Sequence, residues 1–224
     1  MRERIVAETR GNPLALLELP RGLSPEQLAG GFGLPNAVPL SSRIEERFLR
    51  RLEDLAEETR LLLLVAAAEP VGDPALLWRA AERLAITGEA VEPAERAGLL
   101  ELAPRVRFRH PLVRSAVYRA ASSGARQKVH RALAEVTDPE LDPDRRAWHR
   151  AHAALGPDEE VAAELERSAG RAQLRGGLAA AAAFLERAVV LTLDPGLRAQ
   201  RALAAAQAKH LAGAPATAGR RRPA

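Results

Sequence analysis

The chain has 224 residues, enough for two domains that each bury a hydrophobic core without covalent cross-links. It has no cysteine, which excludes disulfides and thiolate metal sites, and its five histidines lack the spacing of metal-ligand pairs, so we expect no metal. The formal net charge is +4 with 33 basic residues, but arginine alternates with glutamate along the expected helices. This pattern favours a solvated surface of mixed charge over a basic stripe for nucleic acid.

No segment has the pattern of a membrane anchor. The longest apolar run, residues 61–68, is far shorter than the roughly 20 residues that span a bilayer. The chain opens without the charged and then apolar pattern of a signal peptide, so we expect a cytoplasmic protein with no membrane partner.

Residues 1–40 are predicted to form short helices separated by glycine-rich turns. An amphipathic stretch ends at Gly11, and Asn12 and Pro13 then provide an N-cap and a first-turn proline for the next helix. We interpret the glycine-rich segment 28–39 as a loop. Neither the dinucleotide fingerprint nor the phosphate loop of nucleoside triphosphatases occurs anywhere in the sequence.

Residues 41–121 show the element order of a winged helix: helices, then a hairpin, then one more helix. Two short apolar stretches, Leu99–Leu102 and Val106–Phe108, bracket Pro104 as in a hairpin, and a helix follows from Pro111. The helix expected just before the hairpin, residues 89–97, has three glutamates and one arginine. Phosphates would repel an acidic recognition helix, so we expect no specific DNA binding. The helices expected before the hairpin cover residues 42–55, 61–68, 74–86 and 89–97.

His110 lies at the junction between the expected strand and the expected helix. Arginines at 105, 107 and 109 alternate with Val106 and Phe108, which is the period of a half-buried strand. A histidine in such a position either caps or packs locally or, backed by arginines, donates to an anion. The residues alone leave both interpretations open.

Residues 122–212 are predicted to be entirely helical. Six residues fall at the small and apolar positions of a 34-residue helix-pair repeat: Leu165, Ala169, Ala172, Ala181, Leu185 and Ala188. Ala199, Leu203 and Ala206 recur one period after the first three. Generic antiparallel helices are the alternative. Residues 213–224 lack apolar periodicity, and we expect a disordered tail. The expected helices cover residues 123–136, 143–155, 158–175, 178–192 and 195–211.

Four phrases of the sequence together resemble one family: GNPLALLEL, PLSSRIEERFLRRLEDLAEETRLLLLVAAAEP, VRFRHPLVRSAVY and AELERSAGRAQLRGGLAAAAAFLERAVVLT. The chain resembles the large ATP-dependent transcriptional regulators of the LuxR type, which are signal-transduction ATPases of the STAND class. The resemblance covers about residues 5–211 and implies an all-α fold. It implies a helical lid at 1–40, a winged helix with a small two-stranded wing at 41–121, and tetratricopeptide-like stacked helices at 122–212.

The resemblance also implies a nucleotide site. It assigns Gly11, Asn12 and Pro13 to the lid motif whose proline packs on adenine, and His110 to the winged-helix histidine that senses the bound diphosphate. ATP or ADP is the ligand of the full-length family. The chain itself has no phosphate loop and no terminal helix-turn-helix, so it looks like the middle of such a regulator, with no cofactor of its own.

Two functions from different classes follow from these observations. The first is a regulatory fragment of a nucleotide-switched transcription regulator, whose helical repeats receive a small-molecule or protein inducer. The second is a stand-alone helical adaptor that binds a protein partner and has no nucleotide role. We expect no enzymatic activity of the chain alone, because no Ser-His-Asp, Cys-His or paired-carboxylate arrangement stands out.

Overall fold

The computed structural model describes residues 50–213 except 70, 103 and 110. Over these residues the chain is predominantly helical, with a single sheet of two short strands, as the sequence predicted. No helix of this part of the chain is both long and apolar enough to cross a membrane. The elements in chain order are α5 (Glu57–Ala68), α6 (Pro74–Arg83), the 3-10 helix η2 (Gly88–Ala90), α7 (Val91–Arg96), β1 (Leu100–Glu101), β2 (Arg107–Phe108), α8 (Pro111–Ala120), α9 (Ser123–Val136), α10 (Pro143–Ala153), α11 (Glu159–Leu174), α12 (Leu178–Leu191) and α13 (Pro195–Gly213).

α5 lies at the centre of the first half of the described chain. Every residue from Leu62 to Ala68 is buried, because α6, α7, α8 and α9 all contact this helix. α6 begins where predicted: the Asp73 carboxylate accepts hydrogen bonds from the amides of Ala75 and Leu76, and Pro74 occupies the first turn. The fully buried large side chains of this core include Leu62, Leu63, Leu77, Leu99, Leu100, Val113 and Leu133.

The predicted hairpin is present. β1 and β2 pair antiparallel with Leu100 opposite Phe108 and Glu101 opposite Arg107. Leu100 is fully buried, so the hairpin is fixed to the first core by one face of its first strand.

The predicted helix 89–97 is divided into η2 and α7. A continuous α-helix from residue 89 would place the Pro93 ring against the carbonyl four residues earlier, and Pro93 donates no amide hydrogen. The 3-10 turn ends before that clash arises, and Pro93 then lies in the first turn of α7, where it is tolerated.

α9 joins the two halves. Its N-cap is Ser122, whose hydroxyl accepts the amide hydrogen of Ala125 at 3.1 Å. Val129 and Leu133 on α9 belong to the first core, so that core continues past residue 122. The division into domains there stays a prediction.

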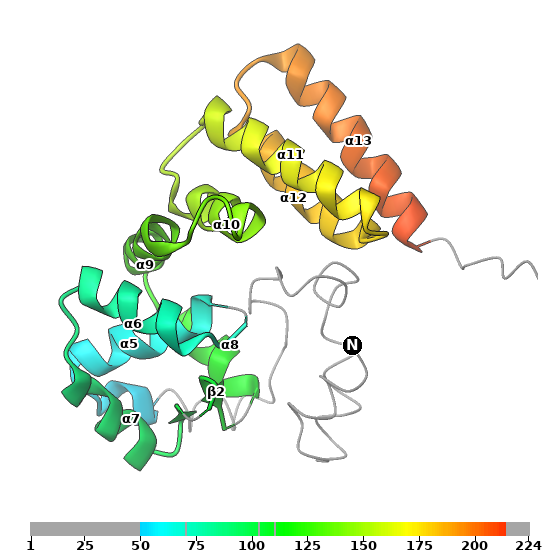
Figure 1. Cartoon of the computed structure of the whole chain (residues 1–224). Coiled ribbons are helices and arrows are strands. Elements are labelled where there is room, and N and C mark those ends of the chain that lie inside the picture. Colours follow the sequence, from blue (N-terminus) through cyan, green and yellow to red (C-terminus); the bar gives the residue numbers. More distant parts are fainter. Residues whose placement is uncertain (1–49, 70, 103, 110, 214–224) are drawn as a thin grey trace, which may run out of the picture.

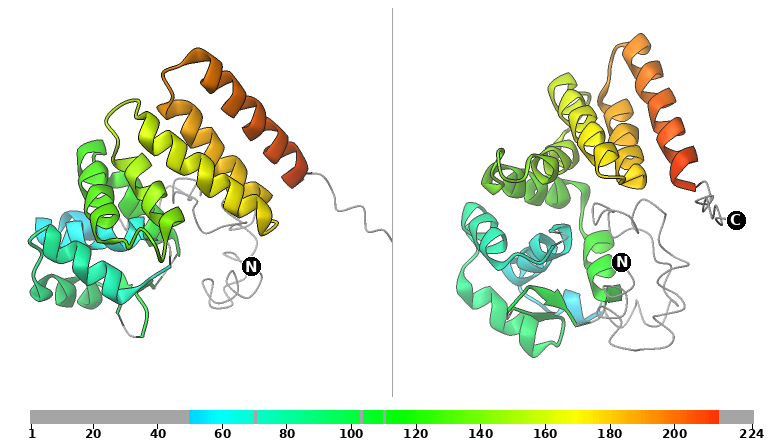
Figure 2. Two further views of the ribbon diagram at one scale, coloured as in Figure 1. Left: turned by 45° about the horizontal axis from the view of Figure 1, so that its top comes forward. Right: turned by 45° about the vertical axis from the view of Figure 1, so that its right-hand side comes forward.

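α11, α12 and α13 lie side by side and form a helical layer beyond α10 (Figures 1 and 2). A second hydrophobic core, centred on Trp148, Leu165, Phe184 and Leu185, holds α10 to this layer. The five predicted helices from 123 to 211 are confirmed, each with bounds within about two residues of those expected.

Candidate functional site

The residues predicted to contact nucleotide, Gly11, Asn12, Pro13 and His110, lie outside the described residues. The structure does describe the segments on either side of position 110. β2 ends at Phe108 and α8 begins at Pro111, so the strand-to-helix junction predicted from the sequence is confirmed.

The backbone and side chain of Arg109 are both anchored beside this junction. Its amide donates to the carbonyl of Leu99 at 3.1 Å, and its Nε lies 3.1 Å from Oε1 of Glu101. Arg105 and Arg107 are exposed, whereas Val106 between them is buried. The predicted alternation is therefore confirmed, and it places guanidinium groups in solvent next to the junction, where they can attract an anion.

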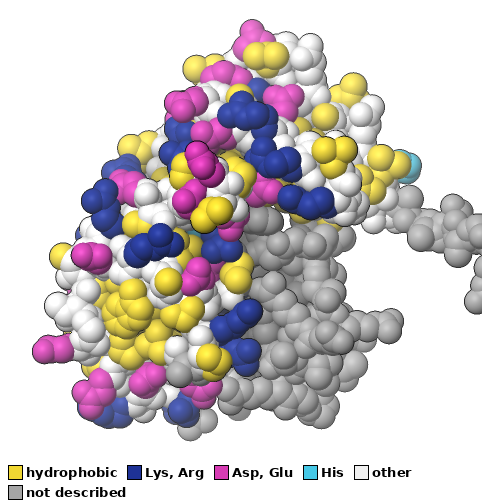
Figure 3. Space-filling model, in the orientation of Figure 1, with side chains coloured by type: hydrophobic (Ala, Val, Ile, Leu, Met, Phe, Trp, Pro, Cys, Tyr) yellow, Lys and Arg dark blue, Asp and Glu magenta, His cyan; other side chains and the backbone are white. Residues whose placement is uncertain are grey.

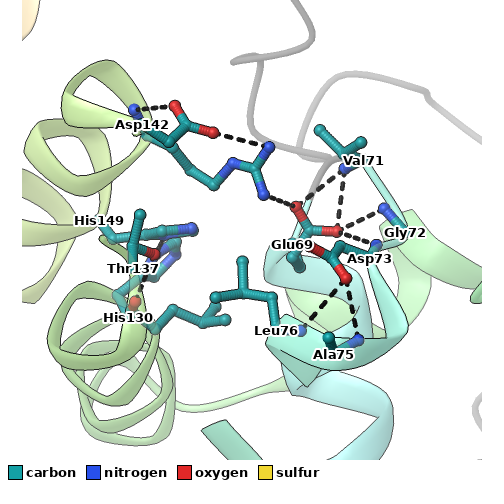
Figure 4. A network of polar contacts seen from close by, with 12 residues as sticks. Glu69, Val71, Gly72, Asp73, Ala75, Leu76, His130, Thr137, Asp142 and His149 are labelled. Atoms are coloured by element: carbon teal, nitrogen blue, oxygen red, sulfur yellow. Dashed lines mark hydrogen bonds and ion pairs between the residues drawn. The ribbon is translucent and has the colours of Figure 1, made fainter. Parts of the chain in front are cut away.

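A buried carboxylate organises the turn between α5 and α6 (Figure 4). Glu69 is 3% exposed, and its oxygens accept the backbone amides of Val71, Gly72 and Asp73. One carboxylate thus satisfies three amides that a tight turn would otherwise leave without partners.

Gly72 is required in this turn for two reasons. Its φ of +73° is unfavourable for other L-residues, and a Cβ at this position would lie 2.4 Å from the carbonyl oxygen of Val106. The approach is close because the amide of Val106 donates to the carbonyl of Gly72 at 3.1 Å. The turn is thereby joined to the backbone just before β2.

Arg145 extends this network from the turn to α10. Its Nη1 lies 3.4 Å from Oε1 of Glu69, and its Nη2 lies 2.8 Å from Oδ2 of Asp142, the N-cap of α10. The Arg145 and Glu69 side chains are both largely buried. Breaking such a pair would leave an uncompensated buried charge, so the network fixes α10 relative to the α5–α6 turn.

A second polar cluster consists of His130 on α9 with His149 and His152 on α10. The Nδ1 atoms of His130 and His149 lie 2.9 Å apart, and Nε2 of His130 lies 2.8 Å from the hydroxyl of Tyr118. The rings of His130 and His152 stack at a tilt with centroids 5.0 Å apart, and His152 contacts Trp148 edge to face.

These histidines are held neutral. Burial lowers the pKa of His130 to about 3, with further lowering from the guanidinium groups of Arg187 and Arg126. Burial likewise lowers the pKa of His149 and His152 well below the ordinary value, and nearby His130 adds to the effect. A neutral imidazole can be a base or a metal ligand.

Neither role fits the geometry of the histidine cluster. His130 and His149 are fully buried, and the polar atoms that face His130 are Nδ1 of His149 and a Tyr118 hydroxyl whose pKa burial raises to about 12. Among the described residues, no group of three or more His, Cys, Asp or Glu side chains is arranged to hold a metal ion. We therefore interpret the cluster as a polar part of the core that fixes α8, α9 and α10 together.

An open groove of about 250 Å³ lies between α9, α10 and the start of α11. Its arginines include Arg146 and Arg150, which are both paired with Glu164 across the groove. Because Arg146 and Arg150 are each paired with a carboxylate, they do not make the groove a strong anion site.

Neither polar network was predicted from the sequence. Glu69 directly follows the wholly apolar run 61–68, and His149 and His152 are three residues apart on one helix face; these were the available signals. Neither signal identifies the partner, because Arg145 meets Glu69 and His130 meets His149 only in the folded chain.

No protein-family model, curated protein sequence or solved structure matches the chain.

Proposed function

We propose that the chain is the regulatory part of a nucleotide-switched transcription regulator of the LuxR type. In this proposal residues 1–40 form the lid of a separate nucleotide-binding core, and residues 41–121 form a winged helix. Gly11, Asn12, Pro13 and His110 contact ATP or ADP, while the stacked helices at 122–212 receive an inducer or partner. The resemblance of four sequence phrases, in order, motivates the proposal.

The observation that carries the proposal is the junction between β2 and α8. The hairpin is anchored in the core by Leu100 and is followed by a helix that begins at Pro111. Arg109, the last residue before position 110, forms an ion pair with Glu101. A donor presented next to a helix start and beside exposed arginines suits a phosphate group. The element order α5, α6, α7, hairpin and α8 is also that of a winged helix.

The helix before the hairpin argues for a regulatory rather than a DNA-reading winged helix. α7 and η2 carry Glu89, Glu92 and Glu95, and the nearest arginine, Arg96, is paired with Glu92. Affinity for duplex DNA rests on basic groups that neutralise phosphates, and this element offers few.

The second half supports a tetratricopeptide-like interpretation of α11 to α13. Leu165, Ala169 and Ala172 are buried on α11, at the positions that the helix-pair repeat reserves for small and apolar side chains. Ala181 and Leu185 are buried on α12, at further positions of the same pattern. Such layers present extended surfaces for partners.

The chain is not proposed to hydrolyse ATP by itself. Phosphoryl transfer needs magnesium ligands and a loop that cradles the phosphates, and the sequence contains no such loop. Nucleotide in this proposal is a switch ligand, held in the closed state between the core and the junction at His110.

The test is nucleotide affinity of a protein that carries both a phosphate-loop domain and this chain. We expect His110→Ala to weaken ADP binding about tenfold or more, because one charge-assisted phosphate contact contributes on the order of 1 to 3 kcal/mol. The matched control is His210→Ala, which removes an exposed imidazole from α13. Fluorescent ADP titrations would compare the three proteins.

The thermal stability of residues 1–224 completes this test. If His110 serves the nucleotide, His110→Ala changes the free energy of unfolding of this chain by less than about 1 kcal/mol. A large drop in the melting temperature of His110→Ala with unchanged ADP affinity would mean that His110 has a local structural role, and it would refute the proposed switch.

The second candidate is a stand-alone helical adaptor with no nucleotide role. It is favoured by the outer face of α13, where Leu203 is 62% exposed. The genomic sequence immediately upstream discriminates the two functions, because a phosphate loop in frame favours the nucleotide switch.

A further inference from the structure

The outer face of α13 carries four exposed apolar residues. Ala199, Ala202, Leu203 and Ala206 share one side of the helix and are all exposed. Figures 1 and 2 show α13 at the outer edge of the layer, and Figure 3 shows hydrophobic side chains along that edge. Within the described part of the chain, no helix lies beyond it.

The internal repeat shows what this face corresponds to. One period of 34 residues before Ala199, Leu203 and Ala206 lie Leu165, Ala169 and Ala172 on α11. These α11 residues are 0%, 2% and 4% exposed, because they belong to the core that α11 shares with α12. The outer face of α13 is therefore the counterpart of a face that in α11 is covered by a helix.

The opposite face of α13 packs against the preceding helix. Ala205 and Ala208 are buried in the core shared with α12, the preceding helix. The α11 residue one period before Ala205 is Arg171, which bonds Asp144 on α10, again the preceding helix. The match is limited to this contact, because Arg167 and Leu174, which lie one period before the buried Arg201 and Ala208, are exposed on α11.

α12 covers the corresponding face of α11, and it shows which residue types such a covering helix carries. α12 places Ala181, Leu185 and Ala188 in the shared core, which is alanine, leucine and alanine at spacings of four and three. α13 carries the same three residue types at the same spacings on its outer face, at 199, 203 and 206. The positions one period after those of α12 are Pro215, Gly219 and Arg222, which cannot provide this pattern.

We propose that α13 binds α13 of a second copy of this chain, antiparallel and about a two-fold axis between Leu203 and Ala206. In an isologous dimer the same patch of both copies forms the interface, so the outer face of α13 in each copy covers that of the other. In this register Leu203 meets Ala206 of the second copy. The exposed Arg198 side chains lie at opposite ends, about 20 Å apart along the helix axes, so they do not repel strongly.

The expected dimer is weak and concentration-dependent. A single helix pair buries less than the roughly 1,200 Å² of a stable complex, so we expect a dissociation constant in the micromolar range. The inference rests on the helix-pair repeat that the proposed function assigns to α11, α12 and α13, but it does not depend on nucleotide binding, so the two can fail separately.

The test is sedimentation equilibrium of the full chain over a range from about 1 μM to about 1 mM. We expect a monomer–dimer equilibrium in the wild type and at least a tenfold higher dissociation constant for Leu203→Glu. The control is Leu141→Glu, which places the same charge at an 85% exposed leucine in the turn before α10 and should not change the dissociation constant. Circular dichroism verifies that both variants keep the wild-type helix content.

A mixing experiment tests the register. Leu203→Glu and Ala206→Lys should each be monomeric alone and should dimerise when mixed, because the antiparallel pair brings the two substituted positions together. A wild-type chain that stays monomeric, or a dimer that Leu203→Glu does not weaken, overturns the proposal. The outer face of α13 would then bind a helix of a different protein. Dimerisation of the wild type without recovery in the mixture overturns the antiparallel register.

Discussion

The buried histidines should make the stability of this protein depend steeply on pH between 7 and 5. Burial lowers the pKa of His130 to about 3, whereas an unfolded chain binds the proton with a pKa near 6.5. The unfolded state therefore binds more protons below pH 6.5, and the folded state loses stability as the pH falls. The contribution of His130 to the free energy of unfolding is fully present above pH 6.5 and decreases as the pH falls toward 3.

The magnitude follows from the two pKa values of His130. At pH 5 the unfolded histidine is protonated and the folded one is neutral, so 1.5 pH units at about 1.4 kcal/mol each give about 2 kcal/mol. His149 is equally buried, and its pKa is shifted in the same direction, so the loss for the whole cluster exceeds that of His130 alone. Against a typical free energy of unfolding of about 5 to 15 kcal/mol, this is a large fraction.

Urea unfolding at pH 7, 6 and 5 measures this loss. Trp148 is a suitable probe, because its ring is buried and contacts His152 with centroids 4.4 Å apart. We expect His130→Gln to reduce the fall in free energy between pH 7 and pH 5 by about 2 kcal/mol, since glutamine does not titrate. The control His210→Gln, at an exposed position, should leave the fall unchanged. A wild-type free energy that is constant over this range, or an equal fall in His130→Gln, would refute the reasoning.

Three further outcomes are expected. Gly72→Ala should lower the free energy of unfolding by more than about 1 kcal/mol, because the added Cβ would collide with the Val106 carbonyl. A thermal melt checks this, and the control is Gly88→Ala, because a Cβ at that position meets nothing within 4 Å. Arg201→Ala should cost about 1 to 3 kcal/mol in denaturant melts, because the guanidinium is 5% exposed and bonds both carboxylate oxygens of Glu159. The full chain should bind duplex DNA only weakly and without sequence preference in mobility-shift titrations, and tight operator binding at physiological salt would contradict our interpretation of α7.

Local sequence signals determined where most helices begin. Ser122 caps α9, Asp142 caps α10 and Asp158 caps α11, each by a side-chain oxygen that accepts a backbone amide. These contacts span three residues and need no tertiary partner, so the sequence alone defines them. The same holds for the hairpin, whose apolar alternation and central Pro104 are local features.

Helix ends and polar partners depended on tertiary contacts. The helix predicted to run to residue 86 ends at Arg83, and Ala85 adopts a φ of 58°, which lets Ile86 turn into the core. α5 begins at Glu57, one turn before the apolar run, with the acidic Glu57 and Glu58 in its first turn and Thr59 already buried. Apolar periodicity reports burial and not hydrogen bonding, so it cannot place such ends.

The sequence by itself determined that this protein is helical, that a small hairpin precedes a helix near residue 110, and that the second half consists of helices of defined length. The tertiary structure alone decided that Glu69 meets Arg145 and that His130 meets His149. The members of each pair lie on different elements, and the lowered pKa values of His130 and His149 come from burial that no local pattern encodes. The outer face of α13 needed both, because the sequence contains the repeat but only the structure shows that Leu203 is exposed.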